Sequence, residues 1–91
     1  MVTIKKFYAT WCPSCLLVGP TLETVVASRP GFAIVNLDVD KSGAELQRYN
    51  LTGIPAMVCT DENDVEISRF IGNGTEAELS NWLDHTAVAK H

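Results

Sequence analysis

Apolar and β-branched residues along the chain are grouped into four short runs typical of β-strands, and stretches with helical spacing follow them. The four runs are VTIKKFY (residues 2–8), FAIVNLDVD (32–40), AMVCT (56–60) and VEISRFIG (65–72). The second run opens with four apolar residues in succession, which favours a buried strand. A polar DEND sequence separates the last two runs and indicates a turn, so we expect these two strands to form a hairpin.

The first helix is expected to begin at Pro13, because the first turn of a helix accommodates proline. It should run to about Ser28, before the RPG sequence, with a kink at Pro20, where one backbone hydrogen bond is missing. Its apolar positions are Leu16, Leu17, Leu22, Val25 and Val26.

Capping-box spacing indicates the start of the other two helices. Ser42 with Glu45 predicts a short helix that ends at about Tyr49. Thr75 with Glu78 predicts an amphipathic helix over residues 75–90. The apolar residues available to face the sheet from this last helix are Ala77, Leu79, Trp82, Leu83 and Val88.

The order of elements is therefore β-α-β-α-β-β-α. A strand-helix-strand opening predicts a parallel pair with a right-handed crossover, and the late hairpin adds antiparallel strands to the same sheet. We expect an α/β fold with a mixed four-stranded sheet flanked by helices. With 91 residues, of which 46% are hydrophobic, residues 1–91 should form a single domain.

Charge and composition exclude some classes of function. The net charge is −4, the pI is near 4.9, and the seven Lys and Arg residues are scattered, which argues against binding of nucleic acid. No segment approaches the ~20 apolar residues of a membrane helix, and the first ten residues do not resemble a secretory signal. These features predict a cytoplasmic protein that is not embedded in a membrane.

Cys12 and Cys15 form a Cys-x-x-Cys pair where the first strand gives way to the first helix. The positive end of a helix dipole stabilises a thiolate, which is the form that attacks disulfides. Cys12 would then attack, and Cys15, one turn later, would resolve the mixed disulfide. A structural disulfide is the alternative for this pair. A zinc site would need further ligands, and Cys59, His85 and His91 have no metal-binding spacing.

The sequence around these two cysteines resembles that of the thioredoxin-like dithiol oxidoreductases. The resemblance is carried by FYATWCPSC (residues 7–15), Pro20 eight residues after Cys12, GIP (53–55) before an apolar strand, and Gly72 after the last strand. It implies a cis bond before Pro55 and a backbone at Ile54 that pairs with an extended substrate. The substrate-binding residues implied are Trp11, Pro13, Ser14, Ile54, Pro55 and Gly72.

The chain also departs from the pattern of the family. Thioredoxins proper have a strand and a helix before the active-site strand, so we expect a minimal version of the fold. Where the family usually has a buried aspartate, six residues before the first cysteine, this chain has Lys6, and the usual lysine partner corresponds to Asn36. One expectation is that Lys6, paired with Asp38 on the neighbouring strand, tunes the ionisation of the cysteines. The alternative is that the Lys6 side chain extends to solvent and has no effect on them.

The resemblance implies a protein disulfide reductase that acts as a monomer on protein disulfides, with no metal and no cofactor beyond its redox-active cysteines. Electrons would come from a thioredoxin reductase or from glutathione. A glutaredoxin-like enzyme is a second interpretation that Pro13 supports, although the Gly-Gly signature is only loosely matched at residues 72–74. A redox-independent binding module is a third interpretation, and an oxidase or isomerase in an oxidising compartment is a fourth.

Overall fold

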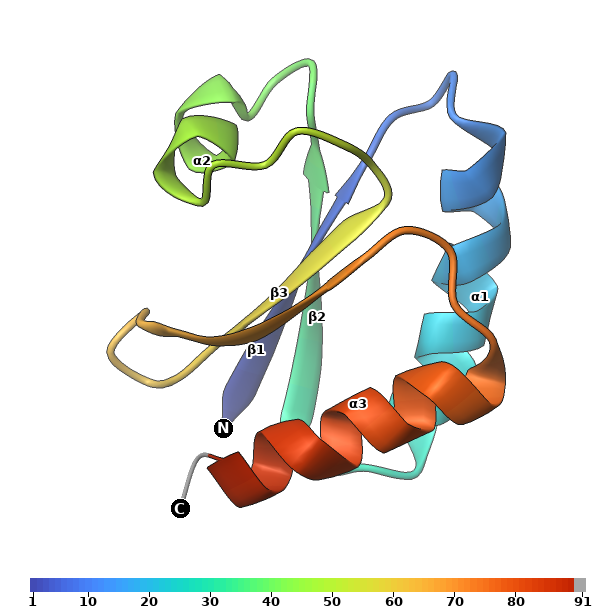
Figure 1. The fold of residues 1–91 in the computed structure, drawn as a ribbon, viewed down its shortest axis with the longest axis vertical. Helices are drawn as coiled ribbons and strands as arrows, with labels where there is room; N and C mark the ends of the chain where they lie inside the picture. Colours follow the sequence, from blue (N-terminus) through green and yellow to red (C-terminus); the bar gives the residue numbers. More distant parts are fainter. Residues whose placement is uncertain (90–91) are drawn as a thin grey trace.

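The computed structural model describes residues 1–89, and the elements follow one another in the predicted β-α-β-α-β-β-α order (Figure 1). Lys90, which falls within the last predicted helix, lies outside the described residues. The elements are β1 (Val2–Tyr8), α1 (Pro13–Ala27), β2 (Phe32–Asp38), α2 (Gly43–Arg48), β3 (Ala56–Thr60), β4 (Glu66–Ile71) and α3 (Glu76–Ala89).

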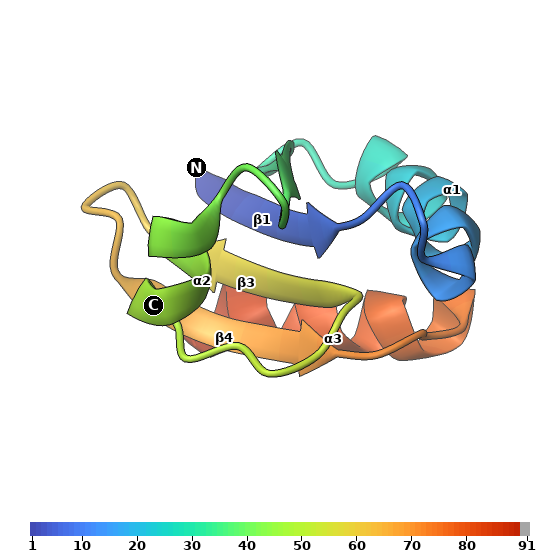
Figure 2. The ribbon, with the colours of Figure 1, turned by 90° about the horizontal axis from the view of Figure 1, so that it is seen from above.

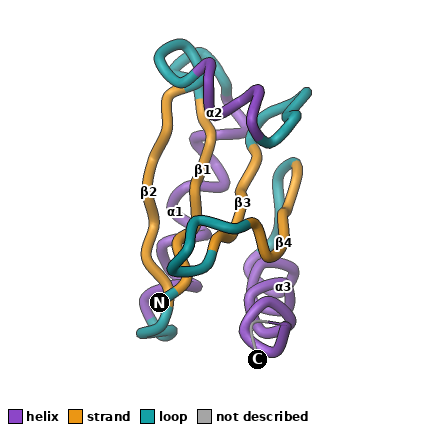
Figure 3. The backbone as a smooth tube through the Cα atoms, turned by 90° about the vertical axis from the view of Figure 1, so that its left-hand side faces the viewer, coloured by secondary structure: helices purple, strands orange, loops and turns teal. Residues whose placement is uncertain are grey.

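The four strands form one mixed sheet in the order β2-β1-β3-β4, and Figure 3 shows them side by side. β1 is parallel to β2, with Lys6 opposite Asn36 and Tyr8 opposite Asp38. β3 is antiparallel to both β1 and β4, so the late hairpin and the mixed sheet are confirmed. In this arrangement the last residues of β1 and the first residues of β3 lie side by side at one end of the sheet, where Phe7 pairs with Ala56.

The prediction of a buried position for the second strand is wrong. β2 lies at the edge of the sheet, and its Val35 and Asn36 are exposed. The inner strands are β1 and β3, and β3 lies between β1 and β4 (Figure 2). Every residue of β3 is buried. An apolar run shows that a strand is at least partly covered, but strand order depends on long-range pairing that the run itself does not encode.

Helices cover both faces of the sheet, with α1 and α3 on one side and α2 on the other (Figure 1). Alternate residues of β3 point to opposite faces. Met57 and Cys59 pack against the apolar sides of α1 and α3, whereas Ala56 and Val58 pack with residues near α2. The core on the side of α1 and α3 consists of Val2, Ile4, Val18, Leu22, Val25, Met57, Cys59, Leu79 and Leu83.

The capping box predicted for the last helix is present. The backbone N–H of Glu78 donates to Thr75 Oγ1 at 3.1 Å, and the N–H of Thr75 donates to Glu78 Oε1 at 3.0 Å. Leu79 and Leu83 of α3 are buried and Trp82 is half-buried, as expected. Ala77 and Val88 do not face the sheet, since both are exposed. The apolar side of α3 is therefore narrower than its composition indicates.

The capping box predicted at Ser42 does not form. The Ser42 side chain makes no capping hydrogen bond, although α2 does begin at the next residue. The carboxylate of Glu45 instead binds Lys5 Nζ at 2.8 Å, and the same ammonium group contacts Asp64 and Tyr49. The ion pair between Glu45 and Lys5 thus replaces the capping bond expected between Glu45 and Ser42, and it links α2 to β1.

Candidate active site

Cys12 is the N-cap residue of α1. After β1 ends, the chain turns through the buried Ala9, whose carbonyl accepts the N–H of Cys12 at 3.2 Å. The Sγ of Cys12 in turn accepts the backbone N–H of Cys15 at 3.3 Å. The first turn of α1 contains no acidic residue, so nothing there opposes the attraction of the helix N-terminus for negative charge. This geometry places the Cys12 sulfur at the positive end of the α1 dipole, at the helix start where the sequence predicts it.

Cys15 lies one turn along α1 and is more deeply buried, with 4% of its surface exposed against 7% for Cys12. Burial raises the pKa of Cys15, and a hydrogen bond with Cys12 raises it further. The backbone at Ala9 and the positive charge of Lys6 act in the opposite direction and partly lower the same pKa. Both thiols are free in this structure, and Cys15 holds its proton more firmly than an ordinary thiol.

The loop before β3 lies against the cysteines. Ile54 packs on the cluster formed by Ala9, Cys12 and Cys15, and the Ile54–Pro55 peptide bond is cis. The carbonyl of Pro55 accepts the N–H of Gly72 at 2.7 Å, which joins this loop to the end of β4. Gly72 has a φ of +93°, a conformation that glycine adopts without strain.

Trp11 borders the same region on the other side of Cys12. It is 65% exposed, and its Nε1 donates to Asp40 Oδ2 at 3.2 Å. A hollow of about 200 Å³ lies beside it, lined by Trp11, Val39, Leu46, Leu51, Thr52, Gly53 and Ile54. The structure thus brings Trp11, Ile54, Pro55 and Gly72 to one end of the sheet with Cys12. Pro13 and Ser14 lie in the first turn of α1 beside them.

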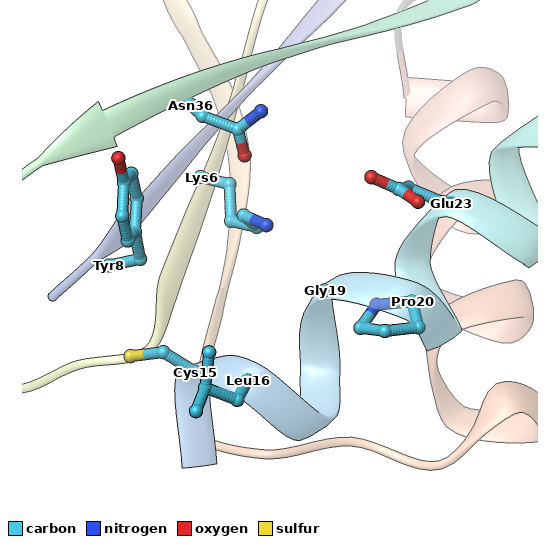
Figure 4. Close-up of a pocket in the computed structure, with 8 residues that line it drawn as sticks. All are labelled: Lys6, Tyr8, Cys15, Leu16, Gly19, Pro20, Glu23 and Asn36. Atoms are coloured by element: carbon cyan, nitrogen blue, oxygen red, sulfur yellow. The ribbon is translucent and has the colours of Figure 1, made fainter. Parts of the chain in front are cut away.

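Lys6 lies behind Cys15. Both residues line a cavity of about 380 Å³ between β1, β2 and α1, and Figure 4 shows the Lys6 amine extending into it. The Nζ atom is 5.8 Å from the centre of the Tyr8 ring. A Cβ atom added at Gly19 would lie 3.0 Å from that Nζ, so the glycine makes room for the ammonium group. The other residues that line the cavity are Leu16, Pro20, Glu23 and Asn36.

The expected ion pair of Lys6 with Asp38 is absent from residues 1–89. Asp38 lies opposite Tyr8 rather than Lys6, and its carboxylate accepts the backbone N–H of Asp40 at 2.9 Å. A carboxylate on the last residue of a strand can accept a hydrogen bond from a backbone N–H of the turn that follows, and Asp38 makes this local bond instead of the longer-range ion pair. The prediction of this ion pair is wrong, although the position of Lys6 beside Cys15 agrees with a role in tuning.

The third cysteine is separate from this site. Cys59 is fully buried in β3, and its burial raises the pKa of the thiol to about 12.

His85 is exposed on α3, whereas His91 lies outside the described residues. Within residues 1–89, no three His, Cys, Asp or Glu side chains are placed to hold a metal ion. No helix in that part of the chain has the length and apolar content needed to cross a bilayer.

Sequence reasoning missed two residues that shape the site. Gly19 accommodates the head group of Lys6, and Asp40 holds the indole of Trp11. Gly19 could have been noticed as a glycine four residues after Cys15, on the side of the helix that faces the sheet. Asp40 carries no comparable signal, because its contact with Trp11 joins segments 29 residues apart.

Comparison with known proteins agrees with this geometry. The thioredoxin family profile matches residues 2–85. A thiol:disulfide interchange protein TxlA homolog from Synechocystis is 37% identical over 73 residues, covering 77% of this chain and 41% of its own length. A Staphylococcus aureus thioredoxin is 30% identical over 84 residues, covering 91% of this chain and 80% of that protein. The chain therefore spans less than half of the Synechocystis protein but most of the thioredoxin.

Solved structures of thioredoxins have the same fold. A mutant thioredoxin from Halobacterium salinarum superposes with a TM-score of 0.81 at 27% identity, covering 93% of this chain and 74% of its own. The germline-specific thioredoxin Deadhead of the fruit fly Drosophila gives a TM-score of 0.82 at 26% identity, covering 92% of this chain and 79% of that one. With its Cys-x-x-Cys pair at the start of α1, the chain belongs to the thioredoxin family, as a thioredoxin-like thiol-disulfide oxidoreductase.

Proposed function

We propose that this protein reduces protein disulfides by dithiol exchange, with Cys12 as the nucleophile and Cys15 as the resolving thiol. The single observation that carries these roles is the inequality of the two thiols. The Cys12 sulfur caps a helix N-terminus, while Cys15 lies behind it with a raised pKa. A sulfur at a helix N-terminus is placed to act as the nucleophile in the first displacement. A thiol that keeps its proton suits the resolving role in the second displacement.

The exchange proceeds in two displacements. The thiolate of Cys12 attacks one sulfur of the client disulfide, a mixed disulfide forms, and the other client sulfur leaves as a thiolate that takes a proton from water. Cys15 then gives up its proton and attacks the Cys12 sulfur, which breaks the mixed disulfide and releases the second client thiol. The client gains two electrons, and the protein retains a Cys12–Cys15 disulfide.

The residues around Cys12 are proposed to hold the client. The exposed Trp11 and the first-turn residues Pro13 and Ser14 lie on one side. On the other side, the backbone of Ile54 is proposed to pair with an extended client segment, beside Pro55. Gly72 is bonded to the Pro55 carbonyl and completes this wall, which supports the assignment. No bound cofactor is needed, because the dithiol itself stores both electrons.

Lys6 is proposed to act on the second displacement. Its ammonium group shares a cavity with Cys15, and its charge lowers the pKa of that thiol against the larger effect of burial (Figure 4). No ion pair of Lys6 is present within residues 1–89, so its charge is not offset by a bound carboxylate. A positive charge there assists the loss of the Cys15 proton without itself accepting it.

The proposed source of electrons is a thioredoxin reductase, since the relatives of similar length are thioredoxins. We further propose that the protein works as a monomer in the cytoplasm. Glutathione is the alternative source, which the proline directly after Cys12 supports by its likeness to glutaredoxins. Turnover of a protein disulfide with thioredoxin reductase and NADPH should exceed turnover with glutathione and glutathione reductase. The opposite ranking would favour the glutaredoxin-like assignment.

Cysteine variants test the mechanism itself. Cys12→Ser should abolish turnover, whereas Cys15→Ser should accumulate a mixed disulfide between Cys12 and the client, visible by mass spectrometry under non-reducing conditions. Turnover that survives in Cys12→Ser would overturn the assignment of the nucleophile. If the double serine variant retained the full biological function of the protein, the redox-independent binding module would be the correct interpretation.

A further inference from the structure

The first half of helix α1 is apolar on the side that faces solvent as well as on the side that faces the sheet. Its 15 residues include one charged residue, Glu23. Helices that are apolar all round are normally covered on all sides. Here the inner side is covered, with Val18, Leu22 and Val25 in the core, but the outer side is open in the structure.

Four exposed residues at helical spacing form a continuous strip on the outer side of α1. Leu16 and Leu17 are 67% and 64% exposed, and Pro13 and Pro20 lie one turn before and one turn after them. Because residues three and four apart share one face of a helix, the four side chains adjoin one another. We call Pro13, Leu16, Leu17 and Pro20 the α1 stripe. Leucines exposed to this extent next to one another mark an interaction surface more often than isolated ones do.

The position of the α1 stripe limits what can cover it. It begins at Pro13, directly after Cys12, so a partner that covers it also covers the approach to the Cys12 sulfur. A partner seated there permanently would block the exchange reaction. The occupant must therefore arrive and leave with each reaction, as the protein that brings a disulfide to Cys12 does.

The chemistry of the stripe indicates which side chains it would contact. Its four residues carry no charge, and Glu23 is the one charged residue of the whole helix. The stripe is also separate from the hollow beside Trp11, which none of its residues lines. An apolar segment on the client, next to its disulfide, would be buried against Leu16 and Leu17.

We propose that the α1 stripe is a docking surface for the oxidised client protein, and that it selects clients with apolar side chains beside the reactive disulfide. This inference rests on the proposed function, because it requires a client disulfide at Cys12. The stripe adds contacts on the far side of Cys12 from Ile54 and Pro55, so it affects which clients bind rather than the exchange chemistry.

The test uses two synthetic peptides with the same disulfide ring, one flanked by leucine and the other by serine. The rate constant for oxidation of the reduced protein is measured with each peptide and with oxidised glutathione. We expect the leucine-flanked peptide to react at least about tenfold faster, the gain from burying roughly two methylene groups. Leu16→Ser/Leu17→Ser should remove this preference, and Leu17→Ser alone should leave the rate with oxidised glutathione unchanged.

Two further variants sharpen the result. Leu16 also lines the cavity around Lys6, so Leu17→Ser alone separates docking from any effect on Cys15, and it should lose part of the preference. Val65→Ser is the matched control, because Val65 is 57% exposed in the turn between β3 and β4, away from the cysteines, and should keep the full preference. Circular dichroism of each variant confirms that the fold is retained.

The outcomes distinguish this inference from the proposed function. Equal rates for the two peptides in the unaltered protein would overturn the docking surface and leave the exchange chemistry intact. Failure of both peptides and of oxidised glutathione to react would overturn the proposed function. A dimer in sedimentation velocity that Leu16→Ser/Leu17→Ser dissociates would show that a second copy covers the stripe, and would contradict the assignment to a client.

Discussion

Cys59 is a buried thiol at the centre of the sheet, and its burial makes the stability of the protein depend on pH above neutrality. Burial raises the pKa of Cys59 from 9.0 to about 12, against a smaller opposing effect of hydrogen bonds with Ser68 and Thr86. In the unfolded chain the same thiol lies in water and ionises with its ordinary pKa. Unfolding above about pH 9 therefore releases a proton that the folded protein retains.

The sign and the size of the effect follow from this difference. The folded state binds more protons than the unfolded state, so the free energy of unfolding falls as pH rises. The contribution is intact below the unfolded pKa of 9.0 and is lost progressively between 9.0 and the folded pKa of about 12. By about pH 10 the loss amounts to roughly 1 kcal/mol.

The assay compares two proteins that differ only at Cys59. Both carry Cys12→Ser and Cys15→Ser, which removes the other thiols, and one also carries Cys59→Ala. Urea unfolding at pH values from about 7 to 10 gives the free energy of unfolding of each. The protein that keeps Cys59 should lose roughly 1 kcal/mol more than the alanine variant over this range. A difference between the two that stays constant with pH would refute the reasoning.

Substitutions at three further positions have defined outcomes. Gly74→Ala should lower the free energy of unfolding by about 1–3 kcal/mol in urea, because a Cβ there would lie 2.8 Å from the Phe70 ring. Thr75→Ala should lower it by about 1 kcal/mol through loss of the α3 cap; an unchanged value would show that the cap is dispensable. Lys6→Met should raise the pKa of Cys15, because the positive charge that lowers it is lost. Resolution of the mixed disulfide by Cys15 should then reach half its maximal rate at a higher pH. Lys6→Arg keeps the charge and should restore the original dependence of this rate on pH.

Local signals in the sequence predicted the elements well. β1 occupies residues 2–8 as expected, α1 begins at Pro13, and the capping box of Thr75 marks the start of α3. The positions of Cys12 at a helix start and of Cys59 in an apolar strand also followed from the residues nearby. These features depend on interactions within a few residues, which the sequence displays directly.

Features that depend on distant parts of the chain were not predictable in the same way. Glu45 could have capped α2, but Lys5 of β1 binds its carboxylate instead. Asp38 could have reached Lys6, but the turn that follows it uses its carboxylate. In both cases two partners compete for one carboxylate, and the packing of the whole fold decides which of them binds it.

The reduction potential of the Cys12–Cys15 pair tests the central claim most directly. The protein is equilibrated in thiol-disulfide buffers of defined potential, free thiols are alkylated, and the fraction bridged is read by mass. A disulfide reductant should have a potential near or below about −230 mV, between glutaredoxins and thioredoxin. A potential of about −120 to −180 mV would indicate a disulfide donor or isomerase, and no reversible bridge at all would contradict the account.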